Sequence, residues 1–93
     1  MDKNKLKKAR NKIDRLDKSI FNLIKKRTII IKYMLSLKQY KNQIVDRKRI
    51  NEILKNIRKK SIQQKIDPAI TKRIWKAIIW SYVDFQKINF KNK

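Results

Sequence analysis

The sequence predicts an all-α protein with three helices per chain, one long and two shorter. Helix-breaking residues are rare, because the 93 residues include no Gly and a single Pro, Pro68. Apolar residues in the first forty positions recur at alternating intervals of three and four, which is the helical period. The 41% hydrophobic content is sufficient for a core, and the length suits one domain covering residues 1–93.

The first predicted helix runs from about Asn4 to Gln39. At 1.5 Å per residue it would be about 50 Å long. Its apolar positions form a heptad seam, the pattern by which helices pair. The members of this seam are Leu6, Ala9, Ile13, Leu16, Ile20, Leu23, Ile30, Met34 and Leu37.

Local signals delimit the two shorter helices. Residues 40–45 break the helical pattern and are predicted to form a loop, after which Asp46 is a suitable N-cap for a helix with Ile50, Ile53, Leu54 and Ile57 on one face. A turn is predicted from Ser61 to Ile66. Asp67-Pro68 then starts a third helix that extends to about Asn89.

The apolar surface of these helices exceeds what one chain can cover. The third helix carries two apolar stripes, one through Ile70 and Ile74 and one through Trp75, Ile79 and Tyr82, and should be buried on two sides. Two short helices are also too small to cover a helix of about 50 Å. A second copy is the simplest cover, so we expect an intertwined homodimer whose long helices pair.

The composition excludes several classes of function. Without Cys or His, the chain has no thiol nucleophile, no His-dependent triad and no zinc-finger site, and we expect neither a metal nor another cofactor. The charged N-terminal segment lacks the apolar stretch of a signal peptide, and the longest apolar run in the first half is only Ile29–Ile31. We therefore expect a cytoplasmic protein without a membrane partner.

The net charge is the most extreme property of the composition. The 28 Lys and Arg residues face only 7 Asp and Glu, for a formal charge of +21. Such a charge is typical of nucleic-acid binding, but it also follows from a compositional bias toward Lys, Ile and Asn. We favour the second explanation, because the lysines are spread along the whole chain. In either case the protein attracts small anions.

One residue interrupts the heptad seam. Arg27 occupies the core position between Leu23 and Ile30, where a buried guanidinium requires an anionic partner. The side chain could instead reach solvent or pair with a carboxylate such as Asp84. With only seven acidic residues in the chain, a carboxylate from a bound ligand is at least as good a partner.

Three further polar residues accompany this seam and the last helix. Arg10 and Lys38 flank the seam at equivalent heptad positions 28 residues apart, so they could meet only if Arg10 came from a second, antiparallel chain. Alone, both are ordinary surface cations. Gln86 follows the stripe of Trp75 at helical spacing, and a buried glutamine must form hydrogen bonds, if only to a nearby backbone carbonyl.

Taken in order, these residues resemble the all-helical chorismate mutase family. The resemblance covers Leu6 to Gln86 and preserves the two long intervals that separate the matching residues. It is carried by the segments Arg10–Asp17 and Leu23–Arg27 and by Lys38, Asp46, Arg49 and Gln86. Each short motif is weak, but the ordered set is specific. The family fold is an intertwined dimer of three-helix chains.

The resemblance implies roles for seven residues. Arg27 and, from the partner subunit, Arg10 would bind the two substrate carboxylates. Lys38 and Gln86 would flank the ether oxygen on which negative charge develops, while Arg49, Asp46 and Tyr82 would line the ring. The substrate would be a small dicarboxylate, and the reaction is the pericyclic conversion of chorismate to prephenate in aromatic amino-acid biosynthesis. That reaction needs no nucleophile and no general base.

Two departures from the family pattern leave alternatives open. Mutases usually carry Glu after the arginine matched by Arg49, where this chain has Ile50, and many have a small hydroxyl residue where it has Tyr82. Both features are more similar to the isochorismate–pyruvate lyase branch, which produces salicylate and pyruvate. We place the mutase first, partly because Asp46 could still accept the substrate hydroxyl.

Two other interpretations stay open. A mutase-like dimer that has lost activity or serves only regulation would also account for Ile50. A basic helical nucleic-acid-binding protein is the alternative from another class. It would need free aromatic side chains, whereas those of the last helix are expected to pack, so we do not expect nucleic acid as the partner.

Overall fold

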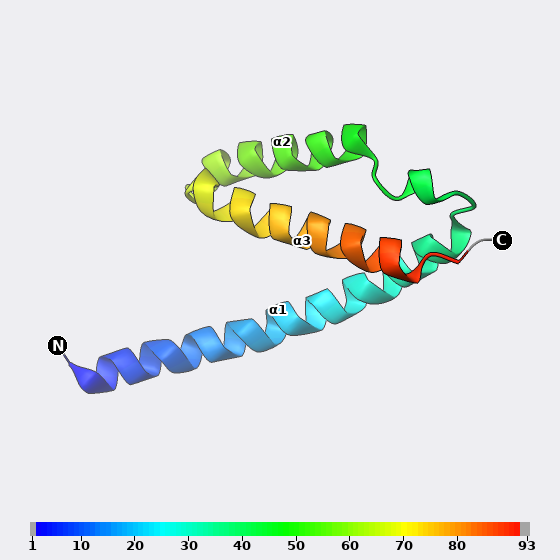
Figure 1. Ribbon diagram of the computed structural model, residues 1–93. Helices are drawn as coiled ribbons and strands as arrows, with labels where there is room; N and C mark the ends of the chain where they lie inside the picture. Colours follow the sequence, from blue (N-terminus) through cyan, green and yellow to red (C-terminus); the bar gives the residue numbers. More distant parts are fainter. Residues whose placement is uncertain (1, 92–93) are drawn as a thin grey trace. The chain divides into compact units, whose positions relative to one another are not determined.

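The protein is all-α, as predicted (Figure 1). A computed structural model describes residues 2–91, and these contain three α-helices, one 3₁₀ turn and no strand. The elements are α1 (Lys3–Leu37), η1 (Lys41–Gln43), α2 (Arg47–Gln63) and α3 (Pro68–Asn89). The chain divides into two compact units, Met1–Tyr33 and Met34–Lys93, called here the first and the second unit.

Helix α1 begins and ends close to the predicted positions, through side chains that the sequence analysis did not single out. At its start the Asp2 carboxylate accepts hydrogen bonds from the backbone N–H groups of Asn4 and Lys5, at 2.9 and 3.2 Å. At its end Gln43 Oε1 accepts from the backbone N–H groups of Gln39 and Tyr40, at 2.8 and 2.9 Å. These bonds replace helical ones, so α1 ends at Leu37, two residues before the predicted Gln39.

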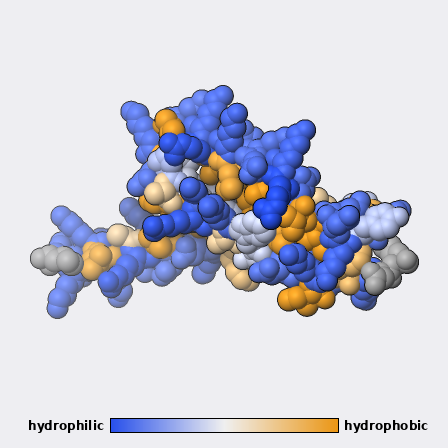
Figure 2. All heavy atoms as spheres, turned by 45° about the horizontal axis from the view of Figure 1, so that its top comes forward, coloured by the Kyte–Doolittle hydropathy of each residue, from blue (hydrophilic) through white to orange (hydrophobic). Residues whose placement is uncertain are grey.

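The heptad seam of α1 is uncovered in a single chain. Its members Leu16, Ile20 and Leu23 are 59, 55 and 62% exposed, and α1 contains no buried residue. Figure 2 shows hydrophobic side chains (orange) at the surface among hydrophilic ones (blue). The half-buried residues of the first unit, Ile24, Arg27, Thr28 and Ile31, follow a neighbouring stripe. One chain therefore leaves the seam without a partner, as its length predicts.

Helix α2 begins where the sequence predicts. Asp46 has an extended backbone and its carboxylate accepts from the N–H of Arg49 at 3.0 Å, so it is the N-cap. The predicted apolar face is also confirmed, because Ile50, Ile53, Leu54 and Ile57 are all half-buried. This face packs against α3, and the two helices run antiparallel (Figure 1).

The predicted turn from Ser61 is shorter than expected. Helix α2 continues to Gln63, and Ser61 is a buried residue of its last turn. The Ser61 hydroxyl lies 2.6 Å from the carbonyl oxygen of Ile57 and 2.6 Å from Thr71 Oγ1 on α3. Serine usually favours turns over helix interiors. Here the hydrogen bond to Thr71 satisfies the buried Ser61 hydroxyl, so this residue is stable in the last turn of α2.

The turn closes with a left-handed residue. Ile66 N–H donates to the carbonyl of Ser61 at 2.9 Å, Lys65 N–H donates to that of Ile62 at 3.3 Å, and Lys65 has φ 59°. This is the hydrogen-bond pattern of a Schellman C-cap, a position that favours Gly because a Cβ atom crowds the backbone there. A chain without glycine therefore carries strain at Lys65.

Lys65→Gly is expected to stabilise the protein by about 1 kcal/mol, because it relieves this crowding. The midpoint of urea unfolding, at one fixed chain concentration, measures the effect. Lys59→Gly is the matched control, since it places Gly inside α2, where it should cost about 1 kcal/mol. Equal destabilisation by both substitutions would contradict the assignment.

Helix α3 forms as predicted and supplies most of the small core. Asp67 caps it by accepting from Ala69 N–H at 2.9 Å, and Pro68 is its first residue. Ile79 and Val83 are buried, together with Ile44 from the segment between η1 and α2. The other apolar stripe of α3 is exposed at its start, where Ile70 and Ile74 are 55 and 47% exposed, and half-buried further along, at Ile78 and Phe85. The expectation of burial on two sides is therefore met only in part within one chain.

Candidate functional site

A partly buried hydrogen bond joins two of the predicted site residues in the second unit. Lys38, which directly follows α1, donates from Nζ to Gln86 Oε1 on α3 at 2.6 Å. Gln86 is only 5% exposed, and its Nε2 donates to the backbone carbonyl of Tyr82 at 3.2 Å. The expectation that Gln86 is buried and hydrogen-bonded is confirmed. These bonds fix the orientation of its amide, with the oxygen on the Lys38 ammonium.

The electrostatic environment of Lys38 is unusual for a lysine. Burial removes water from the ammonium group and lowers the pKa of Lys38 below its ordinary value of 10.5, while the nearby Asp46 carboxylate acts in the opposite direction. Lys38 is half-buried, and its short bond to Gln86 is charge-assisted. A partly desolvated cation of this kind interacts strongly with negative charge that develops on a neighbouring ligand.

The first turn of α2 contributes Asp46, Arg49 and Ile50. The carboxylate of Asp46 caps the helix through Arg49 N–H, and the side chains of Asp46 and Arg49 are exposed. Ile50 is half-buried. The residue after Arg49 is therefore aliphatic and offers no carboxylate to a ligand.

Tyr82 lies on α3 one turn before Gln86 and is half-buried. Its backbone carbonyl accepts the Gln86 amide, so the two residues are directly linked. Lys38, Gln86 and Tyr82 thus form a connected group, and Asp46 lies close enough to influence the Lys38 charge.

The two predicted site arginines of α1, Arg10 and Arg27, lie in the first unit. Arg27 is half-buried, and its Nη1 atom is shielded from solvent, whereas Arg10 is exposed. Seventeen residues separate them along one helix, a distance of roughly 25 Å. Arg10 and Arg27 of the same chain are therefore too far apart to bind one small molecule.

The chemical groups of the candidate site are cations and an amide. Among residues 2–91, no group of three His, Cys, Asp or Glu side chains could hold a metal ion. No helix in that range is both long enough and apolar enough to cross a membrane. The cations and the amide are suited to hold an anion and to stabilise negative charge as it develops.

Comparison with known proteins assigns the chain to a family. The family model described as chorismate mutase type II matches residues 9–87, which is most of the chain. The chain belongs to the chorismate mutase type II family. No curated protein and no solved structure matches it significantly.

The family match includes all the predicted site residues, from Arg10 at the start of α1 to Gln86 near the end of α3. It confirms the resemblance on which their roles rest, and it supports chorismate mutase activity. It does not separately indicate the lyase branch.

Gln43 is a positioning residue that sequence reasoning missed. Its side chain accepts from the N–H groups of Gln39 and Tyr40, directly after Lys38, and so orders the segment that carries this lysine. Tyr40 and Gln43 have the spacing of a capping box, which usually begins with Ser or Thr. The tyrosine in the first position concealed this signal.

Proposed function

We propose that the protein is a chorismate mutase, converting chorismate to prephenate. The observation that carries the proposal is the hydrogen bond between the Lys38 ammonium and the buried Gln86 amide, in a chain of this family. In the reaction one ether C–O bond breaks while one C–C bond forms within the same molecule. No atom enters or leaves, so the enzyme needs only to hold a reactive conformer and stabilise the charge.

Each site residue has a defined task in this proposal. Lys38 and Gln86 donate to the ether oxygen as its bond to the ring lengthens and its negative charge grows. Arg27 forms a fork with one substrate carboxylate. Arg49, Asp46 and Tyr82 lie around the ring. The exposure of Asp46 and Arg49 leaves both available to a ligand, and the Asp46 carboxylate could accept a ring hydroxyl.

We also propose that the active enzyme is a homodimer in the cytoplasm, with Arg10 of the partner subunit binding the second carboxylate. Two findings support the dimer. The α1 seam and the Ile70–Ile74 stripe of α3 are exposed in one chain. Arg10 is exposed and too far along α1 to share a ligand with Arg27 of its own chain.

The activity is tested by turnover of chorismate and isochorismate side by side, with the full chain. We expect prephenate from chorismate. Salicylate from isochorismate, without detectable prephenate from chorismate, would instead establish the lyase. That second candidate is favoured by Ile50, a half-buried aliphatic residue where mutases usually have a glutamate. Absence of both products would contradict the proposed activity and favour a mutase-like protein that has lost it.

The pH dependence of kcat/KM tests the role of Lys38. Activity requires the ammonium form, so kcat/KM should fall as the pH rises through the lowered pKa of Lys38, below 10.5. The Asp46 carboxylate raises that pKa, so Asp46→Asn should move this alkaline fall to lower pH, while Asn preserves the N-cap.

Glu52→Gln is the control for this experiment. It removes the same charge from an exposed residue of α2 and should leave the alkaline fall unchanged. An equal displacement in both variants, or in neither, would contradict the proposed electrostatic link between Asp46 and Lys38.

A further inference from the structure

A cationic groove lies between α2 and α3, apart from the candidate active site. It has a volume of about 300 Å³ and is lined by Leu54, Lys55, Arg58, Pro68 and Lys72. Lys72 precedes Gln86 by 14 residues on α3, which corresponds to roughly 21 Å along the helix. The groove and the Lys38–Gln86 pair therefore lie toward opposite ends of α3.

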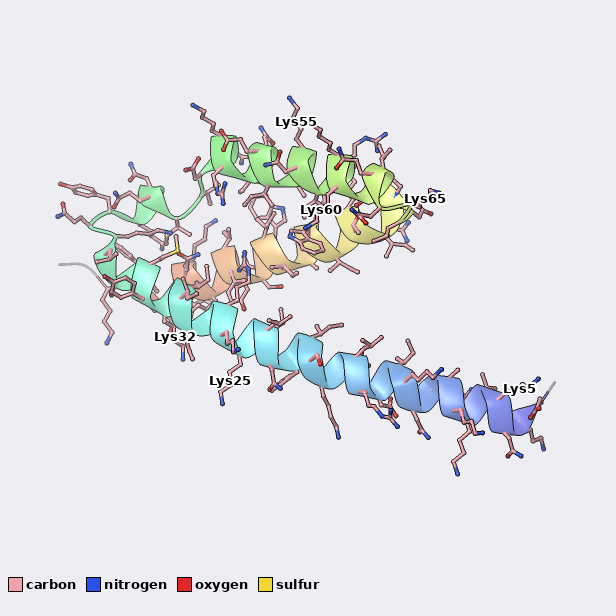
Figure 3. All side chains as sticks on the ribbon, turned by 180° about the vertical axis from the view of Figure 1, so that it is seen from behind. Lys5, Lys25, Lys32, Lys55, Lys60 and Lys65 are labelled. Carbon is pink, nitrogen blue, oxygen red and sulfur yellow. The ribbon has the colours of Figure 1, made fainter. Side chains whose placement is uncertain are left out.

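The lining of the groove combines an apolar surface with positive charge. Leu54 and Pro68 are half-buried, and Arg58 on α2 and Lys72 on α3 provide a cation from each helix. Lys55 contributes at the rim, since its side chain extends from α2 away from α3 (Figure 3). No acidic residue lines the groove. The nearest carboxylate in sequence, Asp67, already accepts from the backbone of Ala69.

We infer that this groove binds a small organic dianion with an apolar body. Arg58 offers a planar fork for a carboxylate or a phosphate group, and Lys72 offers a second point charge. The apolar surface of Leu54 and Pro68 suits a ring between the two charges. The +21 charge of the chain raises the local concentration of such anions.

The test follows backbone amide signals of the full chain by NMR during four separate titrations. The probes are isophthalate and phenyl phosphate, which have an apolar ring and two negative charges, inorganic phosphate, which has no apolar body, and benzyl alcohol, which has no charge. Isophthalate and phenyl phosphate should saturate with shifts centred on Leu54, Arg58 and Lys72. Inorganic phosphate should bind more weakly by at least about 10-fold, and benzyl alcohol should not saturate.

The double substitution Arg58→Gln with Lys72→Gln should weaken dianion binding at least about 10-fold, because each cation supplies a charge-assisted contact. The matched control is Lys59→Gln with Arg73→Gln. It removes one lysine and one arginine from exposed positions of the same helices, outside the groove, and should change affinity less than about 2-fold.

Three results would overturn the inference. An equal loss of dianion affinity in both double variants would show that the dianion is attracted only by the net charge of the protein. Shifts confined to the amides of Lys38 and Gln86 would place the dianion in the candidate active site. Linear, unsaturable shifts with every probe would show that the groove binds none of them.

Discussion

Arg27→Ala is expected to reduce chorismate turnover by about 10²–10³-fold or more, because it removes the cation that we propose holds one substrate carboxylate. The structure makes Arg27 a suitable residue for this task. It is half-buried, with Nη1 shielded from solvent, on a stripe of α1 that also carries Ile24 and Ile31. A guanidinium in such a place is poorly hydrated, so it gains more from a carboxylate than an exposed cation would.

The same substitution should barely change the free energy of unfolding, by about 1 kcal/mol or less in either direction. Replacing a partly buried cation removes a desolvation cost as well as its contacts. Turnover is therefore expected to fall while the free energy of unfolding stays nearly the same. Urea unfolding and steady-state kinetics on the same preparation measure the two effects.

Two further variants make the Arg27 experiment specific. Lys26→Ala removes the adjacent cation, which is exposed, and should leave turnover unchanged. Arg27→Lys retains the charge without the planar fork and should recover part of the activity. Full activity in Arg27→Ala would remove Arg27 from the site. An equal loss in Lys26→Ala would assign the effect to net charge.

Helix boundaries were predictable wherever the determining chemistry is local. Asp46 and the pair Asp67-Pro68 act within three residues of themselves, and both start their helices as predicted. The end of α1 was less predictable, because it depends on a side chain several residues further on. Gln43 accepts from Gln39 and Tyr40 and so ends the helix at Leu37.

Residues whose role depends on tertiary contacts were harder to interpret. Ser61 reads as a turn residue, but its bond to Thr71 holds it in the last turn of α2. Helical spacing indicated that Gln86 is buried, and the structure identifies Lys38 as its partner. Periodicity alone could not reveal that pairing, because Lys38 and Gln86 are 48 residues apart. The ordered resemblance placed them in one site.

Ile20→Glu is expected to abolish the proposed dimer at micromolar chain concentration, and with it the activity. Ile20 lies in the middle of the α1 seam and is 55% exposed in one chain. In an antiparallel pair of α1 helices, with Arg10 of the partner subunit near the Arg27 end, both copies of residue 20 lie close to the centre. Two carboxylates buried there would cost several kcal/mol.

Loss of the dimer should also lower the helical content. Within residues 2–91 of one chain, the buried apolar side chains are those of Ile44, Ile79 and Val83. Such a core is too small to stabilise a long helix whose seam faces water. Sedimentation velocity, circular dichroism and kinetics should therefore change together in Ile20→Glu.

Asn22→Glu is the matched control for the seam. It adds the same single charge to the opposite side of α1, two residues away, at an exposed position. We expect it to remain a dimer with unchanged activity. A wild-type chain that is monomeric and active would contradict the shared site, since Arg10 could not then come from a second chain. If the Ile20→Glu variant were dimeric and active, the interface would lie elsewhere. The exposed seam of α1 would then not pair the two chains, contrary to what its heptad pattern predicts.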